Sequence, residues 1–146
     1  MPSATVLIVE DESDVRDVAS GYVEALGYGV LTARNGDEAL ALVKTDAPID
    51  LLLTDIVMPG SLDGFALSRA AMAVRPNLKI LHVTGYTQHL AAGQHGPGSG
   101  AVIAKPYRME ELRVHLAGLL AGWAVERNPK LRRLHRYWLA KRGTLP

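Results

Sequence analysis

The stretch LLLTDIVMPG, residues 51–60, decides the fold, because an apolar run of strand length ends there in a carboxylate. Such a run is typical of a strand buried on both faces of a parallel sheet, and it ends where the chain reaches the surface. Asp55 is therefore expected at the carboxyl end of a central strand. Open α/β sheets bind their ligands at that edge, so the position alone makes Asp55 a candidate functional residue.

The chain up to residue 121 alternates short apolar runs with segments of helical periodicity. Five runs predict strands: residues 5–9, 29–33, 51–54, 80–83 and 101–104. Four segments predict helices: residues 15–26 with Ser13 as cap and Gly27 as stop, 38–44, 64–74 and 109–123. A glycine-rich segment leaves residues 87–93 for a short, mobile fourth helix. The alternation predicts an α/β doubly wound fold, in which a five-stranded parallel sheet is covered on both faces.

The net charge of +1 conceals two segments of opposite sign. Residues 1–121 carry 9 Lys and Arg against 14 Asp and Glu, a balance of −5, and residues 122–146 carry 7 against 1, a balance of +6. We expect one domain at 1–121 and a basic tail at 122–146. There is no cysteine, which excludes disulfides and thiolate metal sites, and no apolar run has the length of a membrane span. A cytoplasmic protein is expected.

Polar residues follow four of the five predicted strands: Glu10 and Asp11, then Asp55, Thr84 and Lys105. Because parallel strands end at one edge, these side chains should lie close together. Carboxylates that meet repel one another by a few kcal/mol per pair, which favours a hard divalent cation, Mg²⁺ first. A metal, an ammonium, a hydroxyl and a carboxylate nucleophile together predict a pocket for a phosphoryl group.

Each of these residues is a weak signal when it is taken alone. Glu10 and Asp11 also suit the first turn of a helix, where acids are common. Lys-Pro is a frequent dipeptide, and one threonine at a strand end carries little information. Their arrival together at the ends of four strands is what favours a phosphoryl site.

Four motif blocks of the chain resemble the receiver domain of two-component response regulators. The blocks are VLIVEDE from residue 6, LLLTDIVMPG followed by LDG at 62–64, VTGY from residue 83 and AKPY from residue 104. The resemblance covers residues 4–121 and implies the flavodoxin-like strand order 2-1-3-4-5. It also implies a bacterial phosphorelay protein.

The resemblance further implies how phosphorylation occurs. Asp55 would accept a phosphoryl group from a histidine kinase or a phosphotransfer protein. Asp11, Asp55 and the carbonyl of Val57 would ligate Mg²⁺, with Glu10 acting mainly through water. The chain would then signal by binding a downstream protein partner, so it is not expected to be an enzyme, although it would catalyse its own phosphorylation.

Thr84 and Lys105 would bind the phosphoryl oxygens. Hydrolysis of the phosphorylated form should be slow, because Val57 and Tyr86 offer little to orient a water. Two departures from the family pattern concern the output: residues 58–64 form a loop longer by one residue than the commonest version, and Val102 stands where many members keep an aromatic. Tyr86 and Tyr107 are the candidates to replace that ring.

Two other functions suit an architecture of this kind. An aspartate-nucleophile phosphatase of similar architecture would carry a DxDxT signature, but Val57 stands where its second Asp belongs. A receiver-like module that binds without phosphorylation is disfavoured, because every chemical position is filled.

The tail predicts one amphipathic helix after Pro129. Its apolar stripe, opposite a basic face, comprises Leu131, Leu134, Tyr137 and Trp138. We expect an ordered helix that buries Leu134 and Trp138 against the rest of the chain or in a homodimer. Nucleic-acid binding is disfavoured, since a helix-turn-helix needs more helices, and one short basic helix is a weak membrane anchor. LHRYWLAKRGTLP faintly resembles the opening of a bacterial PAS-like domain.

Overall fold

The structure, a computed structural model, describes residues 3–85, 101–127 and 129–142. Within these ranges one parallel sheet has the strand order β2-β1-β3-β4-β5, which confirms the expected order. Its strands are β1 (Thr5–Val9), β2 (Gly29–Ala33), β3 (Leu51–Asp55), β4 (Lys79–Thr84) and β5 (Ala101–Ala104). Each predicted strand is confirmed to within one residue at either end.

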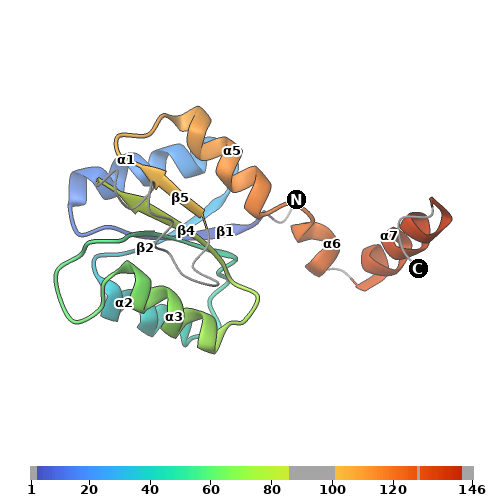
Figure 1. Cartoon of the computed structure of the whole chain (residues 1–146), viewed down its shortest axis with the longest axis horizontal. Coiled ribbons are helices and arrows are strands. Elements are labelled where there is room, and N and C mark those ends of the chain that lie inside the picture. Colours follow the sequence, from blue (N-terminus) through green and yellow to red (C-terminus); the bar gives the residue numbers. More distant parts are fainter. Residues whose placement is uncertain (1–2, 86–100, 128, 143–146) are drawn as a thin grey trace.

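Helices cover both faces of the sheet (Figure 1). They are α1 (Ser13–Ala25), α2 (Gly36–Val43), α3 (Gly64–Val74) and α5 (Met109–Leu119). Alternate residues of β1 point to opposite faces, so Val6 and Ile8 share a core with α1 and α5, while Leu7 and Val9 share one with α2 and α3. The apolar runs of the central strands are therefore explained by burial on both sides. The short helix expected at 87–93 and Tyr86 lie outside the described residues.

Three helix boundaries differ from the sequence predictions. Ser13 was expected to cap α1, but it is the first helical residue, and Glu12 occupies the cap without a side-chain hydrogen bond. The helix expected at 38–44 begins at Gly36, because the Asn35 side chain accepts a hydrogen bond from the Glu38 amide at 2.8 Å. The helix expected at 109–123 ends at Leu119, and Gly122 then adopts a left-handed φ of 81°.

The tail contains two helices, α6 (Trp123–Arg127) and α7 (Pro129–Lys141), which lead away from the sheet (Figure 1). Trp123 packs against the core shared by α1 and α5, and the Arg127 guanidinium pairs with the Asp50 carboxylate. The predicted helix after Pro129 is confirmed. The expected burial of Leu134 and Trp138 within the chain is wrong, since 56% and 52% of these residues remain exposed. No helix in the described ranges combines the length and the apolar character that crossing a membrane requires.

Candidate functional site

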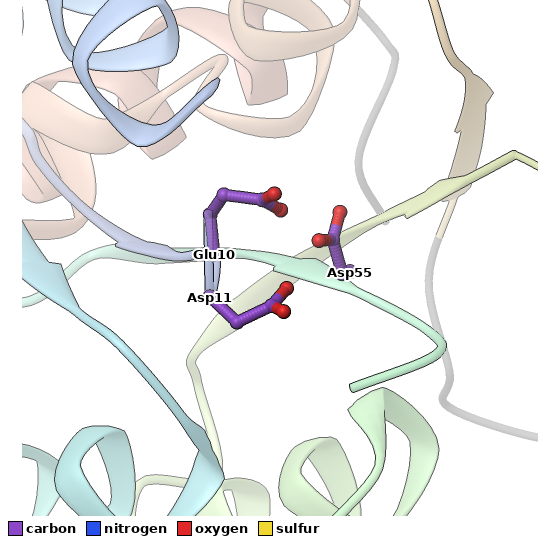
Figure 2. Close-up of side chains that lie close together, drawn as sticks. All are labelled: Glu10, Asp11 and Asp55. Atoms are coloured by element: carbon purple, nitrogen blue, oxygen red, sulfur yellow. The ribbon is translucent and has the colours of Figure 1, made fainter. Parts of the chain in front are cut away.

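The carboxylates of Glu10, Asp11 and Asp55 converge at the carboxyl edge of the sheet (Figure 2). β1 and β3 are parallel neighbours with Val9 opposite Thr54, so the residues that follow come side by side. One oxygen from each of the three carboxylates lies within 4.8 Å of the others. The sequence-predicted acidic cluster is therefore brought together in space.

Lys105 lies between two of these acids. Its Nζ is 3.1 Å from Glu10 Oε2 and 3.0 Å from Asp55 Oδ1. The residue follows β5, two strands from β3, and its backbone amide donates to the Thr84 carbonyl at 2.7 Å. This backbone bond fixes the point from which the side chain reaches across the edge to the acids.

The acids differ in their exposure to solvent. Glu10 and Asp55 are 3% and 6% exposed, whereas Asp11 is exposed. Burial raises the pKa of the Asp55 carboxyl, and the hydrogen bond and charge of Lys105 act against this increase. One ammonium therefore accompanies three carboxyl groups and contacts two of them, so the ionised cluster keeps an excess of negative charge.

The second oxygen of Glu10 supports the same conclusion. Oε1 is buried, and none of the described residues donates a hydrogen bond to it. A buried carboxylate oxygen without a partner is costly, and a cation or its coordinated water removes that cost. The oxygen-only donor set fits a hard divalent metal such as Mg²⁺.

Thr84 and Val57 flank the cluster. Thr84 is buried at the end of β4, one residue beyond Val83, which pairs with Asp55. Val57 lies two residues after Asp55, and its apolar side chain is exposed, so only its backbone carbonyl could serve as a ligand. Both residues lie at the predicted edge of the sheet.

Gly64 is a positioning residue to which the sequence assigned no role. Its amide donates to the Ile56 carbonyl at 2.7 Å, and a Cβ on Gly64 would lie 2.1 Å from the Asp55 carbonyl oxygen. The helix α3 therefore begins directly against the backbone at the end of β3. The Asp63 side chain caps this helix by accepting from the Ala66 amide at 2.8 Å. The Asp-Gly pair before a helical period is the sequence signal that could have revealed this role.

Tyr107 lies beside the acidic cluster. It lines a cavity of about 10 Å³ together with Glu10, Asp55 and Lys105, and its ring meets Tyr22 edge-on with centroids 6.3 Å apart. Burial raises the pKa of the Tyr107 hydroxyl, and the Asp55 charge raises it further. Tyr107, one of the two rings suggested to replace the missing aromatic, thus lies near Asp55. Val102 is half-buried on β5.

Comparisons with known proteins agree with this geometry. The family model of the response regulator receiver domain matches residues 6–117. The response regulator receiver protein CpdR of Brucella abortus is 36% identical over 108 residues, which span 73% of this chain and 88% of CpdR. The sensor kinase CckA of the same organism is 32% identical over 120 residues, but the match spans 81% of this chain and 13% of the kinase.

A solved structure shows the same fold. The response regulator TrrA of Thermotoga maritima, in complex with Mg²⁺-BeF, superimposes with a TM-score of 0.71 and 26% identity. The match covers 80% of this chain and 99% of TrrA. No finding supports the phosphatase interpretation. With the family model spanning most of the chain, the strand order confirmed and the acidic edge in place, the chain belongs to the response regulator receiver domains, the phosphoacceptor modules of two-component signal transduction.

Proposed function

We propose that Asp55 is the phosphoacceptor, and that the donor is a phosphohistidine on a histidine kinase or a phosphotransfer protein. The observation that carries this proposal is the placement of its carboxylate, which ends a central strand and contacts Lys105 at 3.0 Å beside Glu10 and Asp11. Glu10 also contacts Lys105, but it lies one residue beyond the end of β1, whereas Asp55 is itself the last residue of β3.

The acidic cluster would hold Mg²⁺. Asp11, Asp55 and the backbone carbonyl of Val57 are the proposed direct ligands, and Glu10 would act through a coordinated water. Two observations support this ligand set: Oε1 of Glu10 has no hydrogen-bond partner among the described residues, and one oxygen from each of the three carboxylates lies within 4.8 Å of the others. The related protein TrrA was solved in complex with Mg²⁺-BeF. When bound, the metal neutralises oxygens of the incoming phosphoryl group.

In the proposed transfer, an Asp55 oxygen attacks phosphorus in line with the bond to the donor histidine. The new O–P bond forms as the P–N bond breaks, and the electron pair stays on the imidazole, which takes up a proton. Lys105 already contacts both Asp55 oxygens, so its ammonium needs only a short movement to reach a phosphoryl oxygen. The Thr84 hydroxyl, at the end of the neighbouring strand, is the proposed second donor.

The signal would leave through the strands that carry these donors. The Lys105 amide is bonded to the Thr84 carbonyl, so a movement of either residue is felt by the other. We propose that this edge, with Tyr107 beside it, changes which protein partner the domain binds. Residues 1–121 would form the phosphoacceptor domain and 122–146 an accessory tail. The chain would catalyse its own phosphorylation in the cytoplasm, where a histidine kinase would reach it, and act on no separate substrate.

Labelling experiments test this assignment. Wild type, Asp55→Asn and Asp37→Asn are incubated with labelled acetyl phosphate or a phosphorylated kinase, with Mg²⁺ or with EDTA. Asp37 is the matched control, since it is an exposed acid in the first turn of α2 and outside the acidic cluster. We expect Mg²⁺-dependent label on wild type and Asp37→Asn and none on Asp55→Asn. If a folded Asp55→Asn protein were labelled as strongly as wild type, the assignment of Asp55 would be refuted.

A further inference from the structure

The helix α7 presents large apolar side chains to solvent. Leu134, Tyr137 and Trp138 are 56%, 63% and 52% exposed, and these three residues form the exposed stripe of α7. Lys141 and Arg142 lie over the Tyr137 and Trp138 rings, 5.5 and 4.0 Å from the centroids. Such a stripe on a helix that leads away from the sheet is a surface for a partner.

The positive charge of α7 indicates which kind of surface can cover the exposed stripe. The helix contains Lys130, Arg132, Arg133, Arg136 and Lys141 and no acidic residue. Two α7 helices packed against each other would bring these charges together, which is unfavourable. The surface that covers the stripe must therefore be acidic as well as partly apolar.

The face of α1 has the complementary properties. Its exposed residues include Asp14, Asp17 and Glu24, with Val18 55% exposed among them. A Cβ on the neighbouring Gly21 would meet nothing within 4 Å, so the surface there is open to the close approach of a second helix. We call these five residues the acidic face of α1.

Two other surface acids are neutralised by arginines that lie near them in the chain. Glu38 on α2 pairs with Arg34, and Glu110 on α5 pairs with Arg113. The three acids of α1 make no ion pair within the described residues. The helix α1 therefore gathers three exposed acids without ion pairs on one short segment.

We propose that the exposed stripe of α7 binds the acidic face of α1 on a second copy of this chain. Figure 1 shows α1 and α7 at opposite ends of the molecule, so α7 cannot contact α1 of its own chain in this arrangement. Reciprocal exchange between two copies closes a twofold dimer and buries the contact twice. No residue of the exposed stripe or of the acidic face of α1 lines the cavity at Asp55, so Asp55→Asn should dimerise as wild type does, which separates this inference from the proposed phosphorylation.

Charge reversal with the full chain tests the proposal. Sedimentation equilibrium should show a wild-type dimer that weakens as salt is raised. A body-reversed variant, Asp17→Lys with Glu24→Lys, and a tail-reversed variant, Arg133→Glu with Arg136→Glu, should each be monomeric. Their equimolar mixture should dimerise again, because both reciprocal contacts then join opposite charges. Asp46→Lys, which reverses an exposed acid elsewhere, should leave the dimer unchanged.

The apolar contact has its own variant. Trp138→Ala should weaken the dimer by about 30-fold or more, as expected for a central aromatic contact, whereas Val114→Ala, at a 56% exposed valine on α5, should not. Circular dichroism checks that each variant is folded. A wild type that stays monomeric, or a mixture of reversed variants that does not associate, overturns the proposal. Binding of monomeric wild type to phosphatidylserine vesicles, lost in the tail-reversed variant, would assign α7 to a lipid surface instead.

Discussion

Replacing Gly64 with alanine should displace the helix that follows the acceptor strand. The added Cβ would lie 2.1 Å from the Asp55 carbonyl oxygen and 2.7 Å from the Ile56 Cα, both backbone atoms that cannot rotate away. An ordinary contact begins at 3.4 Å, so 3.4 minus 2.1 leaves a displacement of about 1.3 Å. Overpacking of this kind costs about 1–3 kcal/mol, and stretching the 2.7 Å bond from Gly64 to Ile56 adds about 1 kcal/mol.

We therefore expect Gly64→Ala to lower the free energy of unfolding by about 3 kcal/mol, or the melting temperature by about 10 °C. Urea unfolding followed by circular dichroism measures the change. The control is Gly118→Ala on α5, where a Cβ meets nothing within 4 Å and alanine should gain up to about 1 kcal/mol. If Gly64→Ala were as stable as Gly118→Ala, the helix would be free to slide from the acceptor strand and the steric argument would fail.

Three further changes probe the acceptor and its surroundings. In metal-free buffer Asp55→Asn should raise the free energy of unfolding at neutral pH. The reason is that burial raises the pKa of the Asp55 carboxyl in the folded protein, so wild type loses stability as the pH rises from the ordinary aspartate pKa through the raised one. A gain that persists unchanged below the ordinary pKa would contradict this reasoning. Arg75→Met should cost about 2–4 kcal/mol in urea unfolding, because the Arg75 guanidinium donates to four backbone carbonyls between residues 43 and 49. Arg69→Met, at an exposed position of α3, the helix that ends just before Arg75, should change little, and equal effects would refute the hydrogen-bond argument. Val57→Asn should shorten the half-life of phosphorylated Asp55, measured by loss of label with Mg²⁺ present, because an amide two residues after the acceptor can orient a water; an unchanged half-life would show that Val57 does not limit hydrolysis.

The strands and most of the helices follow from local pattern. Five apolar runs gave strands at the expected places, and Gly64–Val74 begins and ends where its periodicity indicated. Burial on both faces leaves a continuous apolar run in the sequence, and a helix with one buried side repeats every three to four residues. The positions of Glu10, Asp55, Thr84 and Lys105 at strand ends follow from the same runs.

Helix ends were less predictable, because they depend on single contacts. The break between α5 and α6 follows from the left-handed φ of Gly122, although the apolar period continues to Trp123. Asn35 begins α2 two residues early through one hydrogen bond. Hydrophobic periodicity reveals neither the hydrogen bond made by Asn35 nor the dihedral angle of Gly122.

Contacts between distant segments required the folded chain. Sheet order and register bring Lys105 between Glu10 and Asp55, 95 and 50 residues away along the chain, and set Gly64 against the acceptor strand. The amphipathic pattern of α7 indicated a helix with one apolar side, yet whether that side is covered depends on what packs against it in space, and here Leu134 and Trp138 are exposed. A side chain's type and spacing are properties of its neighbours along the chain. Its burial, its charge partners and its pKa are properties of its neighbours in space, which only the packing of the whole sheet and its helices determines.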